Sequence, residues 1–139
     1  MSIHQISVFL ENRSGQLAEI TELLANNGID IRAISIAETS DYGLARMIVD
    51  DSQKASSVLL AAGVILSMTP VCAVEVPDQP GGLAAFLRVL ADASVDVEYM
   101  YSLFTHREGR AYMVLRVSDE AALTAHNIRL VGMDELGLK

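Results

Sequence analysis

The chain has few of the residues that characterise disulfide-rich proteins and metalloproteins. Its 139 residues include one cysteine, three prolines and no tryptophan. A single cysteine, Cys72, excludes an internal disulfide and leaves a thiolate metal cluster without its other ligands. The apolar neighbours of Cys72 indicate a buried structural residue, because cysteine in an apolar setting behaves as a small hydrophobic side chain.

Basic residues and long apolar runs are also scarce. Ten Lys and Arg against 18 Asp and Glu give a formal net charge of −8. Nucleic-acid affinity rests largely on basic side chains that neutralise phosphates, so we expect no nucleic-acid partner. No segment approaches the roughly 20 apolar residues of a membrane span, and the first ten residues lack a secretory signal pattern. We therefore expect a cytoplasmic protein with no membrane partner.

The first half of the chain predicts the element order βαββαβ. The strand segments are rich in β-branched residues, and apolar residues in the helical segments recur at a spacing of three or four. The expected strands are residues 3–10, 29–36, 44–49 and 64–68, and the expected helices begin near Leu17 and Ser52.

The second half repeats this order. Its expected strands are 71–76, 95–104, 110–117 and 128–133, and its expected helices are 80–93 and 119–126. An offset of 66 residues pairs Gly15 with Gly81, Leu17 with Leu83, Ile20 with Phe86, Leu24 with Leu90, Asp30 with Asp96, Gly43 with Gly109 and Met47 with Met113. A constant offset across turns, helix faces and strands indicates an internal repeat. We predict two modules, residues 1–69 and 70–139.

The repeated unit predicts an α+β fold. In each module two helices would cover one face of a four-stranded antiparallel sheet, which is the ferredoxin-like arrangement. The opposite face of each sheet would then need other cover, because apolar sheet faces are normally buried. This need favours a homodimer.

The segment Asp78-Gln-Pro80-Gly81-Gly82-Leu83 resembles the D-x-P-G-x-L-type turn that joins the first strand and first helix of ACT domains. The first copy keeps Gly15 and Leu17 but has Asn12 and Ser14 in place of the acidic residue and the proline. With Glu98–Ser102, the chain resembles the stand-alone tandem ACT proteins of bacteria. The resemblance implies a non-catalytic regulatory protein, with side-by-side sheets that hold an amino-acid-like effector at the seam between modules, and no cofactor.

The candidate ligand-binding residues lie in the two turns and in one later strand. The start of a helix offers unpaired backbone N–H groups to a carboxylate, and glycine permits close approach. The candidates are Leu10, Asn12, Arg13, Ser14, Gly15, Gln16 and Leu17 in the first copy, and Asp78, Pro80, Gly81, Gly82, Leu83, Tyr99, Met100 and Tyr101 in the second. An anion should prefer the first turn, where Arg13 is positive, over the second, where Asp78 is negative.

A purely structural interpretation of the same residues stays open. The glycines can serve tight turns alone, Asn12 and Asp78 can be ordinary helix N-caps, and the tyrosines can fill the sheet. Alternatively, the second turn could use Asp78 to hold an ammonium group. Gly15→Asp distinguishes the ligand hypothesis, since it adds a like charge where a carboxylate would bind.

Two other functional classes compete with an amino-acid sensor. A plait-fold enzyme is disfavoured because the chain lacks nucleophile-elbow, zinc-protease and acylphosphatase-type motifs. The three histidines, His4, His106 and His126, are too dispersed to predict a metal site. A ligand-free assembly module that docks on another protein remains the main alternative. The sequence selects neither the effector nor the regulated partner protein.

Overall fold

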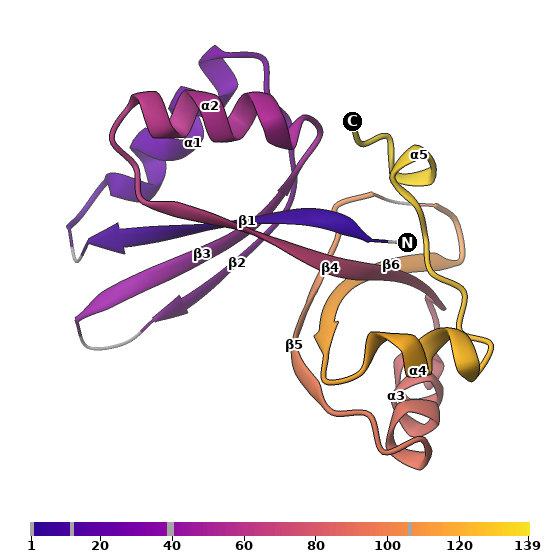
Figure 1. The fold of residues 1–139 in the computed structure, drawn as a ribbon. Helices are drawn as coiled ribbons and strands as arrows, with labels where there is room; N and C mark the ends of the chain where they lie inside the picture. The colour runs from indigo at the N-terminus through magenta and orange to yellow at the C-terminus, as the bar shows by residue number, and fades with distance from the viewer. Residues whose placement is uncertain (1, 12, 39–40, 106) are drawn as a thin grey trace. The chain divides into compact units, whose positions relative to one another are not determined.

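A computed structural model describes residues 2–11, 13–38, 41–105 and 107–139 (Figure 1). By internal contacts the chain divides into two compact units. One unit comprises His4–Pro70 with Gly137–Lys139, and the other comprises Met1–Ile3 with Val71–Leu136. We call them the first and the second module. The last residue belongs to the first module because the Lys139 amide donates to the Asp50 carbonyl oxygen at 2.7 Å.

The first module has the predicted order of elements. These are β1 (Ile3–Glu11), α1 (Gln16–Asn26), β2 (Ile31–Glu38), β3 (Tyr42–Val49), α2 (Ser52–Ala61) and the start of β4 (Leu66–Pro77). The strand order is β2-β3-β1-β4, and β3 pairs antiparallel with both β1 and β2. Helix α2 starts as expected, because the Asp51 side chain accepts from the Lys54 amide at its first turn.

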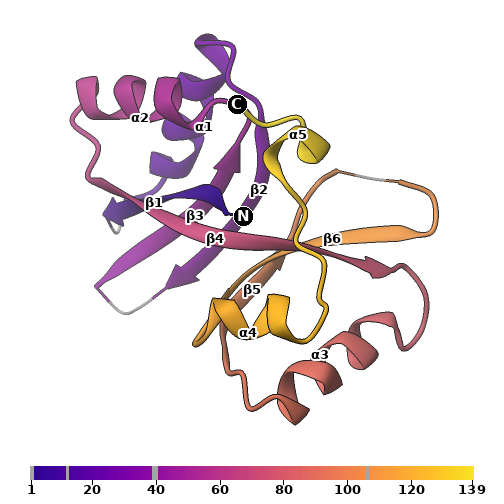
Figure 2. The same ribbon diagram turned by 45° about the vertical axis from the view of Figure 1, so that its right-hand side comes forward.

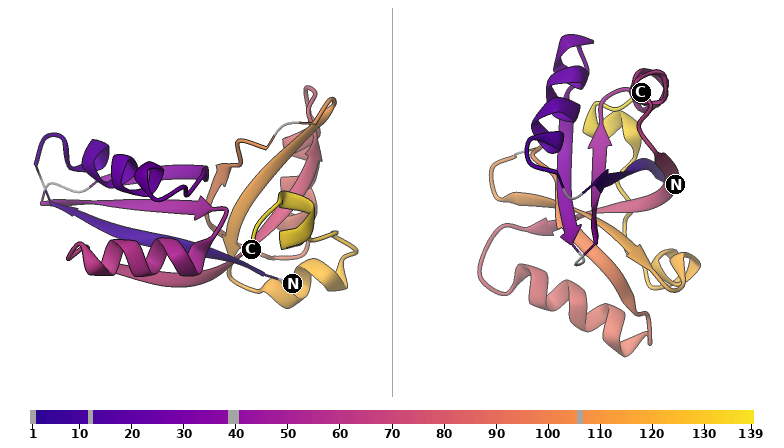
Figure 3. Two further views of the ribbon diagram at one scale, coloured as in Figure 1. Left: turned by 90° about the horizontal axis from the view of Figure 1, so that it is seen from above. Right: turned by 90° about the vertical axis from the view of Figure 1, so that its left-hand side faces the viewer.

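The core of this module lies between its helices and one face of its sheet. Ile20 and Leu24 of α1 are one helical turn apart and pack with buried side chains of β1, β3 and α2, namely Ile6, Val8, Ala45, Met47, Val49, Ala55 and Leu59. Seen from above, α1 and α2 run over the strands of the module (Figure 3). Burying one such leucine side chain stabilises the fold by about 2 kcal/mol.

The second module repeats the pattern in a shortened form. Its elements are the second part of β4, α3 (Gly82–Asp92), β5 (Val97–Ser102), β6 (Arg110–Val117), α4 (Glu120–Ala125) and α5 (Met133–Leu136), with strand order β4-β6-β5. Helices α3 and α4 lie on the same side of these strands (Figure 2). They contribute Leu90 and Leu123 to a core that includes Val74 and Leu115.

Two strand predictions need correction. The strands predicted at 64–68 and 71–76 are one strand, β4, which runs through Pro70. The strand predicted at 128–133 is reduced to a single bridge between Val74 and Leu130, supported by a bond from the Val131 amide to the Ala73 carbonyl oxygen. It ends there because α5 begins at Met133.

The repeat offset also changes along the chain. It is 66 from β1 to β5, so that α1 and α3 match at both ends. From β6 onward it is 68, because Cys72 pairs with Leu115, whereas its equivalent Ile6 pairs with Met47. The N-caps Asp51 and Asp119 keep the offset of 68. The predicted pairs Gly43 with Gly109 and Met47 with Met113 are therefore wrong by two residues, since the second hairpin is longer.

The predicted α+β fold of two tandem ferredoxin-like modules is otherwise confirmed. Each module places its two main helices against one face of its strands. Within the described residues, no helix is long and apolar enough to cross a membrane.

Cys72 lies in the core of the second module and is 1% exposed. Burial, and then the neighbouring Glu120 carboxylate, raise the pKa of its thiol to about 12. Because the thiolate is the reactive form, we expect no labelling of the folded protein by a disulfide reagent at pH 8, and complete labelling in urea. Rapid labelling without denaturant would contradict this burial.

The same pKa shift predicts a loss of stability at high pH. The unfolded thiol ionises near pH 8.5, whereas the folded thiol stays protonated to about pH 12. The folded state therefore binds more protons across this interval, and the free energy of unfolding should fall as pH rises through it. Denaturation curves of the wild type and Cys72→Ala, compared between pH 8 and pH 11, measure this contribution.

Candidate functional site

The turn between β1 and α1 is built around Gly15 and Gln16. Gly15 has φ +85°, a left-handed conformation that favours glycine, and it begins α1 without a side-chain cap. The Gln16 side-chain oxygen accepts from the Glu11 amide at 2.6 Å, which ties the helix start to the strand end. The prediction of a glycine turn that leads into a helix is thus confirmed.

Arg13, at the same turn, forms a two-pronged ion pair with Glu19 of α1. The two guanidinium nitrogens Nη1 and Nη2 lie 2.9 and 3.0 Å from the carboxylate oxygens. Hydrogen bonding and charge from Arg13 hold the pKa of Glu19 below its usual value, and Glu19 raises the pKa of Arg13. The pair persists at neutral pH, so Glu19 offsets the positive charge that Arg13 brings to the turn.

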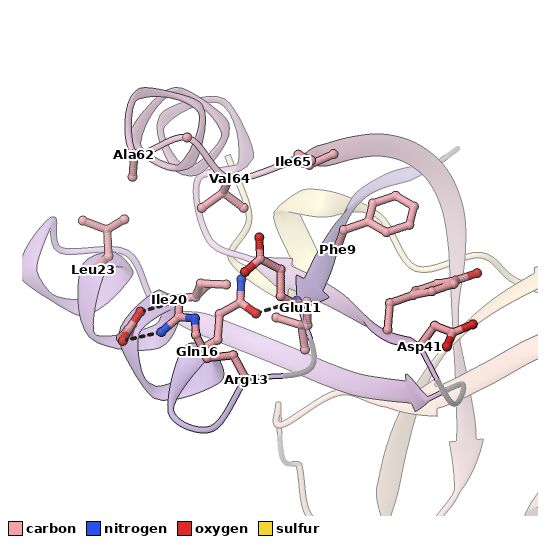
Figure 4. A pocket seen from close by; sticks show the side chains of 14 residues that line it. Phe9, Glu11, Arg13, Gln16, Ile20, Leu23, Asp41, Ala62, Val64 and Ile65 are labelled. Carbon is pink, nitrogen blue, oxygen red and sulfur yellow. Dashed lines mark hydrogen bonds and ion pairs between the residues drawn. The ribbon is translucent and has the colours of Figure 1, made fainter.

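A pocket of about 770 Å³ opens beside this turn, inside the first module. Its volume falls in the range of about 300–1,000 Å³ that is common for small-molecule sites. Figure 4 shows side chains from the end of β1, from α1 and from the segment between α2 and β4 around it. The lining residues are Phe9, Leu10, Glu11, Arg13, Gln16, Glu19, Ile20, Leu23, Asp41, Tyr42, Ala62, Gly63, Val64 and Ile65.

The predicted residues of the first turn divide into two groups. Leu10, Arg13 and Gln16 line the pocket, whereas Ser14, Gly15 and Leu17 belong to the same turn but do not line it. Asn12 lies outside the described residues, so its predicted role stays a prediction. Three of the predicted residues therefore converge on one cavity.

Most of the pocket wall was not predicted. Glu11 precedes Arg13 by two residues in the sequence, and an acidic residue this close to a basic one was a usable signal. The place of residues 62–65 in the pocket could not be predicted from the sequence, because it depends on the pairing of the end of this segment with β1. The Phe9 amide donates to the Ile65 carbonyl oxygen at 3.0 Å, and this contact places the segment.

The second turn has nearly the same backbone conformation as the first, but its hydrogen bonds and its neighbouring pocket differ. Gly81 has φ +87° and, like Gly15, begins its helix without a side-chain cap. Asp78 is therefore not the N-cap of α3; its amide donates to the Gly109 carbonyl oxygen. A smaller pocket of about 420 Å³ lies beside this turn and includes Pro80, Gly81 and Gly82 but neither Asp78 nor Leu83.

The two turns also differ by a matched pair of residues. Gln16 and Glu11, which bond to each other in the first turn, correspond to Gly82 and Pro77 in the second. Pro77 has no amide proton to donate, and Gly82 has no side chain to accept one. The second turn is instead closed tightly, since a Cβ on Gly82 would clash with the Pro77 carbonyl oxygen.

The predicted strand residues lie on β5 of the second module. Met100 packs against the core of that module, and its predicted contact with an effector stays a prediction. Tyr99 and Tyr101, two residues apart on one strand, stack with ring centroids 6.5 Å apart. Tyr101 is buried. That these tyrosines complete the wall of an effector site stays a prediction.

The chain is thus an α+β protein built from two ferredoxin-like modules in tandem. In each module, a turn of the same backbone geometry places a glycine just before the first helix. A family model described as an ACT domain pair matches residues 1–133. The chain belongs to this family, which confirms the resemblance seen in its turns. No curated protein sequence matches the chain.

Solved structures agree with this assignment. A protein from Bacteroides thetaiotaomicron is 36% identical, with a TM-score of 0.88 over 99% of this chain and 96% of that chain. The regulatory subunit of aspartate kinase from Thermus thermophilus, in a ligand-free form, is 20% identical, with a TM-score of 0.65 over 89% of both chains. The corresponding subunit from Thermus flavus is 17% identical, with a TM-score of 0.61 over 98% and 92%. The two aspartate kinase subunits show likeness of fold alone.

Proposed function

We propose that the chain is a non-catalytic regulatory protein that binds a small amino-acid effector in the pocket of its first module. The observation that carries the proposal is the pocket itself, which brings Leu10, Arg13 and Gln16 together beside the start of α1. The regulatory subunits of aspartate kinase, which share the fold, support a regulatory role.

The chemistry of the pocket suits an amino acid. Arg13 offers a guanidinium to a carboxylate, and the start of α1 has no side-chain cap among the described residues, so its first N–H groups can face an anion. Polar groups line one part of the pocket, whereas Leu10, Ile20 and Leu23 line another. An amino acid is divided in the same way, with its charged α-ammonium and α-carboxylate groups at one end and its side chain at the other.

A thermal-shift screen against the twenty amino acids tests the proposal. A ligand that binds only the native state adds about 2.7 kcal/mol to the free energy of unfolding at 100 times Kd. The melting temperature therefore rises with ligand concentration. We expect one or a few amino acids to produce such a rise. If none does, the chain is better described as an assembly module that docks on another protein. Cytoplasmic location, homodimer formation and a regulated partner protein stay predictions.

Glu19→Gln should strengthen effector binding. The substitution removes the charge that competes for Arg13, so a bound carboxylate would no longer have to displace a two-pronged ion pair. We expect a several-fold lower Kd by calorimetric titration. Glu22→Gln, an exposed position on the same helix that does not line the pocket, is the matched control. An unchanged or weaker affinity in Glu19→Gln would show that Arg13 does not receive the carboxylate.

A further inference from the structure

The charges around the pocket of the first module are unequal. Three acidic residues, Glu11, Glu19 and Asp41, line it against one basic residue, Arg13. Since Glu19 already engages Arg13 through two short contacts, the remaining charge in the pocket is negative. A simple anion is therefore a poor match, and a ligand must bring at least one positive group.

Glu11 is the acidic group that is placed to receive that positive charge. The bond from its amide to Gln16 fixes its backbone at the mouth of the pocket. Figure 4 shows its side chain directed into the pocket from the end of β1. Among the described residues, the Glu11 carboxylate forms no hydrogen bond or ion pair, although its charge helps to raise the pKa of Arg13, whereas the Glu19 carboxylate is paired with Arg13.

Most of the rest of the wall is apolar. Two rows of side chains face the cavity, one from β1 and α1 and the other from the segment that leads into β4. They are Leu10, Ile20, Leu23, Ala62, Val64 and Ile65. A charged ligand side chain placed against these groups would lose its hydration without gaining a partner, which is costly.

Building on the proposed function, we infer that the effector is an amino acid with a free α-ammonium group and a large uncharged apolar side chain. Glu11 holds the ammonium, and the two apolar rows enclose the side chain. A second positive charge, as in lysine, would lie against the apolar rows and lose its hydration without gaining a partner. A second negative charge, as in glutamate, would meet the acidic lining.

Calorimetric titration of the full chain with leucine, phenylalanine, glutamate, lysine and N-acetyl-leucine tests this inference. We expect leucine or phenylalanine to bind at least tenfold tighter than glutamate, lysine and N-acetyl-leucine, which lacks the positive charge. Glu11→Gln should weaken binding of the apolar amino acid about tenfold, as expected for a lost charge-assisted hydrogen bond, and leave N-acetyl-leucine unchanged. Glu22→Gln should change neither affinity.

The outcomes separate this inference from the proposed function. Preference for glutamate or lysine, equal binding of leucine and N-acetyl-leucine, or no effect of Glu11→Gln would overturn the inferred class while leaving amino-acid binding in place. Absence of binding by all twenty amino acids would overturn both. A circular dichroism melt of Glu11→Gln that matches the wild type confirms that a lost affinity is not lost folding.

Discussion

Replacing Gly82 by alanine should destabilise the second module by about 2–3 kcal/mol, near the upper end of the usual cost of overpacking. A Cβ at this buried position would clash with the carbonyl oxygen of Pro77. That carbonyl cannot easily turn away, because it accepts a hydrogen bond from the Gln79 amide at 3.0 Å. Relief would require the turn between β4 and α3 to open.

Urea denaturation of the wild type and of Gly82→Ala measures this cost. Gln16→Ala is the matched control, because Gln16 occupies the equivalent position of the first module and there carries a side chain. The control should lose only about 1 kcal/mol, the value of one turn hydrogen bond. If both variants unfold at the same urea concentration, the second turn relaxes freely and is not tightly closed.

The second large effect is expected on ligand binding. Gly15→Asp places a negative charge at the start of α1, between the pocket residues Arg13 and Gln16. Apart from its neighbours in the chain, no heavy atom lies within 4 Å of a Cβ built at Gly15. The cost in stability is therefore that of the left-handed backbone alone, about 1 kcal/mol. Repulsion of the effector carboxylate should lower the affinity at least tenfold.

Gly81→Asp provides the control for this prediction. Gly81 has nearly the same backbone angles, φ +87° and ψ −10° against +85° and −7°, and equally open surroundings. Both variants should therefore lose similar stability, but only Gly15→Asp should lose the thermal shift produced by an amino acid. Equal loss of binding in both would place the effector elsewhere, and unchanged binding in Gly15→Asp would remove the first turn from the site.

Local sequence rules predicted much of the fold. The spacing of Ile20 and Leu24 gave the buried face of α1, and the left-handed backbone at Gly15 and Gly81 follows from their place in the turns. The fusion of two predicted strands into β4 was missed because Pro70 reads as a break, although an exposed strand position needs no amide donor. The two extra residues of the second hairpin were hidden by chance matches of glycine and methionine.

The site was less predictable than the fold. Sequence proximity identified Leu10, Arg13 and Gln16, which lie close together at the connection between β1 and α1. It did not reveal that Glu19, six residues after Arg13, folds back onto it, since this spacing crosses from a turn into a helix. The apolar row from the α2–β4 segment depends on strand pairing between residues that are over fifty positions apart, which no local pattern encodes.

The paired differences at the two turns bear on how the copies diverged after duplication. Each turn has a pair of residues that fit each other, Glu11 with Gln16 in the first and Pro77 with Gly82 in the second. A turn that combined one residue from each pair would not fit. Restoring glutamine at position 82 alone would drive a side chain into the Pro77 carbonyl oxygen, and the proline would still offer no amide proton. A single mutation therefore cannot return the second turn to the form of the first, so selection is expected to keep the two copies distinct.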